Sequence, residues 1–186
     1  MAVRDILIWP HPVLDTRAEF VSEIDQTIQS LTDDLIDTCE EIGGLGLAAP
    51  QIGVGLQVFV LNIGMATGTQ QGYEIFINPT QMLSEDEDLV EEGCLSLPGI
   101  KAKIKRAVRY GIEYTTIEGN REEIASDGLL GQALQHEMDH LAGEVMVRKM
   151  SNLKRPSVRQ KMKILKRRMK TEAVTYHDVI RSPSEQ

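Results

Sequence analysis

Two histidines that lie four residues apart, His136 and His140, constrain this chain more than any other feature. On a helix, side chains four residues apart lie on the same face, one turn from each other, so both imidazoles can reach one metal ion. Glu137 directly follows the first histidine, where it can accept a proton without binding the metal. The pattern H-E-x-x-H therefore supplies two metal ligands and a general base, and the third ligand decides the class of site.

The helix that carries this pair is expected to be central to the fold. Ser126-Asp127 offers an N-cap, and Gly143 stops the helix, which ends at about Leu141. Apolar residues occupy two faces of the segment, which indicates that other elements pack on both sides. They are Leu129 and Ala133 on the histidine face, and Leu130, Leu134, Met138 and Leu141 on the other.

Hydrophobic periodicity predicts the other elements. Apolar residues recur every three or four positions at 25–42 and 157–170, which is typical of amphipathic helices. A loop is expected at 64–72, Asn78-Pro79 is expected to end a strand, and 84–88 is an acidic surface loop. Apolar runs and alternation predict strands at 57–62, 73–77, 103–108 and 110–117.

These elements predict an α+β domain with antiparallel or mixed sheets packed around the central H-E-x-x-H helix, and with a C-terminal helix. The expected parts are a catalytic domain at 1–150, a basic helix of the same domain at 151–172, and a flexible tail at 173–186. A chain of 186 residues that is 41% hydrophobic can form one core. No apolar run is long enough to span a membrane, and the first residues do not resemble a secretion signal.

Cys94 is the best candidate for the third metal ligand. A metzincin protease needs a third histidine where Met146 stands, and a gluzincin needs a glutamate in a segment that holds no acidic residue between Glu144 and Glu172. Glu144 itself stays open as a ligand. A thiolate suits zinc and the later first-row metals, and three protein ligands leave a position for water, as in catalytic sites.

Charge is divided unevenly along the chain. Between Arg148 and Lys170 there are eleven Lys and Arg residues and no Asp or Glu, whereas the rest of the chain has nine basic and 28 acidic residues, a net charge of −19. The division favours an acidic body with a basic segment that meets a polyanion. The alternative is a solvated helix that docks through an apolar stripe of Val158, Met162 and Leu165.

Three motifs follow one another along the chain. They are Gly44-Leu45-Gly46-Leu47-Ala48-Ala49-Pro50-Gln51, Glu92-Gly93-Cys94-Leu95-Ser96 and Gln135-His136-Glu137-Met138-Asp139-His140. In this order they resemble the motifs of the bacterial peptide deformylases. The similarity covers about residues 3 to 165, and the long basic C-terminal helix resembles the form found in many Gram-negative members.

The resemblance implies a metal-dependent hydrolase that removes the formyl group from the N-terminal formyl-methionine of nascent polypeptides and releases formate. Metal-bound water would attack the formyl carbon, with Glu137 as general base and then as acid. The oxyanion would be held by the metal, the side-chain amide of Gln51 and the backbone N–H of Leu95.

The resemblance also implies the metal and the substrate contacts. The ligands would be Cys94, His136 and His140, and the usual ion Fe(II), although ligand softness alone allows zinc, nickel or cobalt. The methionine side chain would enter an apolar pocket while the substrate backbone runs close to two glycines as an added strand. The expected substrate-binding residues are Leu45, Gly46, Val90, Gly93, Leu129 and Ala133.

The partners implied by the resemblance are formyl-methionyl nascent peptides and the ribosome. The basic helix at 154–170 would hold the enzyme on ribosomal RNA near the exit tunnel, in salt-dependent binding. We expect a monomer that has no membrane partner. Because Cys39 and Cys94 are the only cysteines and Cys39 lies on an apolar helical stripe, we expect free thiols in a reducing cytoplasm.

Several alternatives stay open. A metalloendopeptidase shares H-E-x-x-H but would use a histidine or glutamate in place of Cys94. A structural metal module would need a fourth protein ligand, for which Cys39 and His11 are the only plausible donors. Glu92 is either one more acidic surface residue or a residue that orients the cysteine loop. The amide of Gln132 either shapes the substrate pocket or points to solvent.

Overall fold

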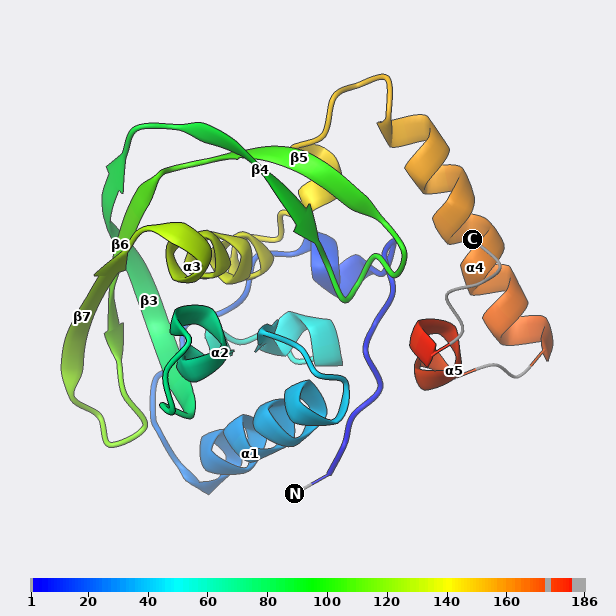
Figure 1. Cartoon of the computed structure of the whole chain (residues 1–186). Coiled ribbons are helices and arrows are strands. Elements are labelled where there is room, and N and C mark those ends of the chain that lie inside the picture. The colour runs from blue at the N-terminus through cyan, green and yellow to red at the C-terminus, as the bar shows by residue number, and fades with distance from the viewer. Residues whose placement is uncertain (1, 173–174, 182–186) are drawn as a thin grey trace.

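The computed structural model of the chain describes residues 2–172 and 175–181, and within them two antiparallel sheets surround one helix (Figure 1). The larger sheet has the order β1-β2-β3-β6-β7 and the smaller one pairs β4 with β5. The strands are β1 Gly46–Ala48, β2 Val58–Asn62, β3 Tyr73–Glu85, β4 Asp88–Gly93, β5 Lys101–Arg106, β6 Arg109–Thr115 and β7 Arg121–Ser126.

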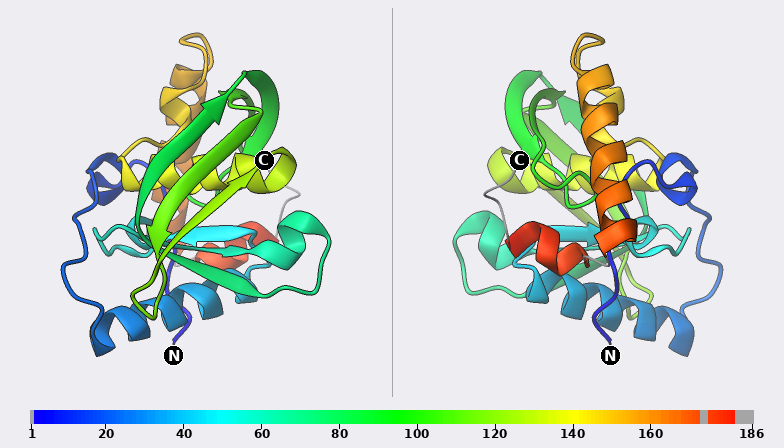
Figure 2. Two further views of the ribbon diagram at one scale, coloured as in Figure 1. Left: turned by 90° about the vertical axis from the view of Figure 1, so that its left-hand side faces the viewer. Right: turned by 90° about the vertical axis from the view of Figure 1, so that its right-hand side faces the viewer.

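Helices cover the larger sheet on both sides, with α1 on one side and α3 on the other (Figure 2). The β4–β5 hairpin arches over α3, so that this helix lies between the two sheets (Figure 1). The α-helices are α1 Gln26–Glu41, α2 Ile63–Thr67, α3 Gly128–Leu141, α4 Arg155–Glu172 and α5 Tyr176–Arg181, and the 3-10 helices are η1 Pro12–Asp15, η2 Ala49–Ile52 and η3 Met146–Arg148.

Alternation along β2 divides the core into two layers. Val58 and Val60 belong to the cluster that includes the buried face of α1, whereas Phe59 and Leu61 belong to the cluster around α3. The Phe59 ring stacks on Phe76 of β3 with a centroid distance of 4.6 Å. Because successive strand side chains point to opposite faces, one strand supplies both layers, and α3 is enclosed as the α+β prediction required.

The basic helix α4 lies along one side of the body (Figure 1). Its Val158 and Met162 are buried in the α1-side core. Two of its cations reach the N-terminal segment: the Arg159 guanidinium lies 5.6 Å from the ring centroid of Trp9, and Lys166 Nζ donates to the Pro10 carbonyl at 3.1 Å. None of the helices in the described residues is long and apolar enough to cross a membrane.

The structure corrects several predicted boundaries. β3 continues through Asn78-Pro79 to Glu85, because a register shift against β6 between Ile77 and Thr80 accommodates the proline. Most of the predicted acidic loop at 84–88 belongs to the ends of β3 and β4. The predicted loop at 64–72 begins with the short helix α2, since the Asn62 side chain accepts from Met65 N.

The segment 173–186, which was expected to be a flexible tail, contains the helix α5. Residues 173, 174 and 182–186 of that tail lie outside the described residues. Three predicted elements are confirmed to within a few residues. The helix α1 matches the prediction at 25–42, α4 matches 157–170, and the strand β2 matches 57–62.

Candidate active site

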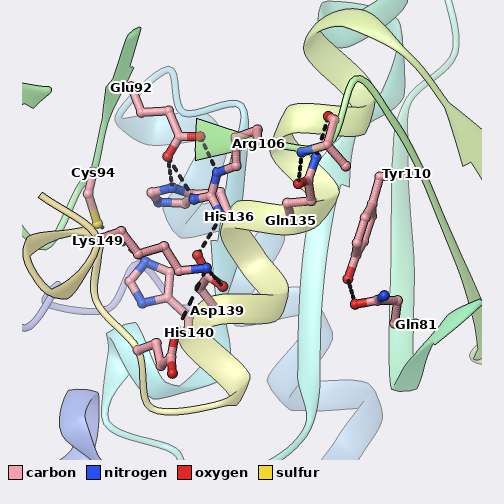
Figure 3. Close-up of polar contacts among 12 residues, drawn as sticks. Gln81, Glu92, Cys94, Arg106, Tyr110, Gln135, His136, Asp139, His140 and Lys149 are labelled. Atoms are coloured by element: carbon pink, nitrogen blue, oxygen red, sulfur yellow. Dashed lines mark hydrogen bonds and ion pairs between the residues drawn. The ribbon is translucent and has the colours of Figure 1, made fainter. Parts of the chain in front are cut away.

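Three side chains from two elements converge beside α3. His136 and His140 point from the same face of the helix with ring centroids 5.1 Å apart, and Cys94 follows the end of β4 (Figure 3). Cys94 Sγ lies 3.3 Å from His140 Nε2, and one ligand atom of each residue lies within 4.8 Å of the others. A tetrahedral ion with ordinary bond lengths separates sulfur and nitrogen ligands by about 3.6 Å, so this group is the right size for one metal.

The backbone after β4 turns sharply to present Cys94 to the helix. The N–H of Leu97 donates to the Cys94 carbonyl at 2.9 Å, which closes a turn directly after the strand. Since β4 pairs with β5 over its whole length, the hairpin fixes where the turn begins. The cysteine is thus positioned by strand pairing and the histidines by helix packing.

A buried network orients His136. Its Nδ1 lies 3.1 Å from Glu92 Oε2, which leaves Nε2 to face the cysteine. Arg106 binds both oxygens of Glu92, and its Nη1 donates to Asp139 Oδ2 at 2.6 Å (Figure 3). Lys149 Nζ lies 2.7 Å from the other oxygen of Asp139. Glu92 therefore orients a histidine, rather than lying as an acidic surface residue or orienting the cysteine loop.

The charges of this network hold the groups in defined protonation states. Burial raises the pKa of Glu92, but hydrogen bonds from Arg106 and His136 outweigh it and lower the pKa to about 2. Burial, followed by the charges of His136 and Arg106, lowers the pKa of His140 well below its ordinary value. Burial lowers the pKa of His136, but hydrogen bonds to Cys94 and Glu92 outweigh it and raise the pKa well above its ordinary value, so a metal that binds this ring must displace a proton. The neutral His140 and the ionised Glu92 are already in the states that metal binding requires.

Glu137 lies against the glycine-rich segment. A Cβ placed on Gly46 would lie 2.9 Å from Glu137 Oε1 and 2.3 Å from a methyl of Leu61, so only glycine allows β1 to approach so closely. Burial raises the pKa of Glu137 to about 7, with a smaller opposing effect from the charge of His136. Its Oε2 is buried and has no hydrogen-bond partner among the described residues.

Gln51 is held in a fixed orientation within the same site. Its Oε1 accepts from Ala48 N at 2.9 Å, and its Nε2 donates to Ser96 Oγ at 3.3 Å. The side-chain amide has two N–H groups, so one remains to meet a ligand. Gln51 and Leu95 both line the pocket that contains Cys94.

The pocket has a volume of about 540 Å³, which is ample for a short peptide end. It brings together most of the predicted substrate residues, and the half-buried Gln132 also lines it, with its Nε2 3.3 Å from the Glu91 carbonyl. Val90 lies next to Glu91 on β4 but is not among the described residues that line the pocket. The predicted residues that do line it are Leu45, Gly46, Gly93, Leu129 and Ala133.

Comparison with known proteins decides the family. Residues 3–156 match the family model described as polypeptide deformylase. The chain belongs to the polypeptide deformylase family. Over 147 residues it is 40% identical to the peptide deformylase of Bartonella bacilliformis. This match covers 76% of this chain and 81% of the Bartonella protein.

Solved deformylase structures resemble the whole fold. A peptide deformylase from Legionella pneumophila superimposes with a TM-score of 0.84 at 38% identity, covering 91% of this chain and 99% of that one. The enzyme from Ehrlichia chaffeensis in complex with actinonin gives a TM-score of 0.83 at 36% identity, covering 90% and 99%. The resemblance on three motifs and the predicted fold class are thereby confirmed.

Sequence reasoning did not find three residues of this deformylase site: Arg106, Asp139 as its partner, and Tyr176. Arg106 could have been found, because Lys101, Lys103 and Lys105 alternate with buried residues along β5 and place Arg106 on the inward face. Asp139 stands inside the H-E-x-x-H motif but has no fixed role in that pattern. Tyr176 carried no signal, since nothing in the tail indicated a helix.

Proposed function

We propose that this chain uses Cys94, His136 and His140 as metal ligands and Glu137 as proton carrier in the reaction of its family. The chain is a metal-dependent hydrolase that removes the formyl group from the N-terminal formyl-methionine of nascent polypeptides. The observation that carries the residue assignment is the convergence of one thiol and two imidazoles beside a buried carboxylate with an unpartnered oxygen.

The donor set fits a divalent transition metal with one open position. One sulfur and two imidazole nitrogens suit the later first-row metals, and the ion that we propose is Fe(II), with zinc, nickel or cobalt as substitutes. When bound, the metal would polarise the formyl oxygen and lower the pKa of a water molecule. The Glu92–His136 hydrogen bond would hold the ring for coordination through Nε2.

Glu137 would handle the proton of the reaction. It lines the same pocket as Cys94 and His136, and a pKa of about 7 without metal suits a group that must both accept and release a proton near neutral pH. The carboxylate would accept the proton of the attacking water and then deliver it to the departing amine. The formate and the free amine leave without any covalent bond to the protein.

Two donors would stabilise the negative charge that develops on the formyl oxygen. The free N–H of the Gln51 amide is pre-oriented, because its other N–H and its oxygen are already bonded to Ser96 and Ala48. The second donor is the backbone N–H of Leu95, next to the cysteine. Donors that are fixed before reaction cost no reorganisation when the charge appears.

The substrate would lie between β1 and the end of β4. Gly46 and Gly93 keep the two edges open to an extended peptide, and the α3 face with Leu129 and Ala133 would receive the methionine side chain. We propose that actinonin, which is bound in the Ehrlichia chaffeensis structure, occupies the same pocket here.

A formate-release assay on formyl-Met-Ala-Ser tests the assignment. The protein is purified without oxygen, and we expect the natural chain to release formate. Glu137→Gln should release formate about a hundredfold more slowly, while its metal content stays unchanged. Cys94→Ser should lose the metal. Full activity of Glu137→Gln would overturn the proton role, and peptide-bond cleavage by Cys94→Ser would favour the metalloendopeptidase alternative.

We further propose that α4 binds ribosomal RNA. Eleven cations without one acidic residue between Arg148 and Lys170 support this. Val158, Met162, Arg159 and Lys166 hold the helix on the body, whereas the exposed Lys161, Lys163 and Lys170 face solvent. Replacing the exposed Lys161, Lys163 and Lys170 of α4 with glutamate should weaken salt-dependent co-sedimentation with ribosomes and spare hydrolysis of a small formyl peptide, because these side chains lie outside the pocket and the metal-site network. Unchanged co-sedimentation at low salt would contradict the proposal.

We also propose that the enzyme is a cytoplasmic monomer with one catalytic domain at 1–150 and α4 as part of it. Two buried free thiols suit a reducing compartment, and the burial of Val158 and Met162 joins α4 to the domain core. The exposed large apolar residues of the protein come from many separate elements rather than from one strand or helix. A monomer is expected to show such scattered residues, whereas a subunit interface would gather them in one patch. Sedimentation equilibrium would check the mass.

A further inference from the structure

The helix α5 lies beyond the residues that the deformylase family model matches, yet it reaches the active site. Its side chains Tyr176, Val179 and Ile180 line the same pocket as Cys94 and Glu137. The helix is short, but its start is fixed locally. Asp178 Oδ2 accepts from both the backbone N–H and the hydroxyl of Thr175 at 2.8 and 2.6 Å, as in a capping box.

One hydrogen bond joins α5 to the cysteine loop. The Tyr176 hydroxyl donates to the Leu95 carbonyl at 2.8 Å, one residue after the thiol. Tyr176 is only 2% exposed and Val179 only 8%, so the helix is docked by buried side chains rather than resting on the surface. Ile180 packs against the same core at partial exposure.

α5 narrows the pocket without filling it. With the helix in place, about 540 Å³ remains, which is within the range of ordinary ligand sites. A helix that acted as a plug would leave no such space. α5 is therefore a wall of the pocket, and its Val179 and Ile180 make that wall apolar.

The wall formed by α5 and the face formed by α3 are two separate parts of the pocket lining. The α3 face consists of Leu129, Gln132 and Ala133, and Gln132 contacts the Glu91 carbonyl of β4. The α5 wall contacts the loop after β4 instead, at the Leu95 carbonyl.

An extended substrate would contact both the α3 face and the α5 wall. Successive side chains of an extended peptide point in opposite directions, so a methionine side chain that enters toward α3 directs the next side chain away from α3. The formyl group ends the substrate on its other side and brings no side chain of its own. The residue after formyl-methionine is thus the part of the substrate that can reach α5.

We propose that α5 forms an apolar subsite, made by Val179, Ile180 and Leu95, for the side chain of the second residue of the formylated peptide. This inference rests on the proposed function. It predicts that the enzyme prefers an apolar side chain to a small polar one at this position, and that the preference depends on α5.

Paired substrates measure the subsite directly. The ratio of kcat/KM for formyl-Met-Leu-Ser over formyl-Met-Ser-Ser is compared in the natural chain, Val179→Ser and Ile180→Ser, with Ile164→Ser as matched control. Ile164 is 58% exposed on α4 and does not line the pocket. We expect the ratio to fall by about tenfold in the α5 variants and to stay unchanged in the control.

The ratio is insensitive to misfolding, because a loss of folded protein lowers both rates equally. An unchanged ratio in both α5 variants would overturn the proposed subsite. An equal rise in kcat/KM for both peptides would also overturn it, because α5 would then act as a lid. Calorimetry measures the affinity of the same peptides for Glu137→Gln, with and without Ile180→Ser. It therefore tests the contribution of the subsite to binding independently of turnover. Absence of formate release by the natural chain would instead reject the proposed function.

Discussion

Arg106→Met tests whether the buried charge network stabilises the proposed metal site. Arg106 is 4% exposed and binds two carboxylates, Glu92 and Asp139. Methionine has a similar length and fills most of the same space, so the change removes a charge and its hydrogen bonds rather than a large volume. Glu92 is then left with His136, and Asp139 with Lys149, in a place that water reaches poorly.

The size of the effect follows from the electrostatics. The pKa of Glu92 is about 2 instead of its ordinary 4.5, and a difference of this size corresponds to about 3 kcal/mol of stabilisation at neutral pH. Breaking a buried ion pair by removing one partner typically costs about 3–5 kcal/mol. We therefore expect Arg106→Met to lower the free energy of unfolding by about 3–4 kcal/mol at pH 7.

The dependence on pH identifies the cause. Because the folded-state pKa of Glu92 is depressed, its contribution is fully present above the unfolded value of 4.5 and is lost as the pH falls toward about 2. The penalty of Arg106→Met should therefore shrink on acidification. Urea unfolding of metal-free protein at about pH 7 and about pH 3 measures it without the loss of metal at low pH.

A surface ion pair gives the matched control. Arg121 and Glu113 lie 2.6 Å apart on neighbouring strands, but they are 50% and 41% exposed. Arg121→Met should cost at most about 1 kcal/mol, since solvent screens such pairs. If Arg106→Met cost no more than this control, or if its penalty did not change with pH, the network would not have the role assigned to it.

The glycine and amide of the first motif give two further predictions. Gly46→Ala should lower the free energy of unfolding by about 1–3 kcal/mol and displace Glu137, because the new methyl would lie 2.3 Å from Leu61 and 2.9 Å from the Glu137 carboxylate. Thermal unfolding measures the loss of stability, and formate release measures the displacement of Glu137. Gln51→Ala should lower kcat by about 10²–10³ with the metal retained, and unchanged kcat would remove the amide from the oxyanion site.

Most of the fold, and the shared helix face of the two histidines that we propose as metal ligands, could be predicted from the sequence because their signals are local. The spacing of His136 and His140 is a property of one helix, and the apolar periodicity of α1 and α4 is a property of each helix alone. The continuation of β3 past Pro79 was not predictable in the same way. It depends on Asn78, whose side chain accepts from Val21 N and donates to Val21 O, 57 residues earlier.

The groups that sequence reasoning missed act across the fold. Arg106 is separated from Asp139 by 33 residues and Tyr176 from Leu95 by 81, and no periodic pattern records such contacts. Arg106 nevertheless left a trace, since an inward position on an alternating strand holds a charge only when a partner is buried beside it. The same rule, applied to any strand next to a predicted metal motif, would identify the residue that orients the ligands before a structure is known.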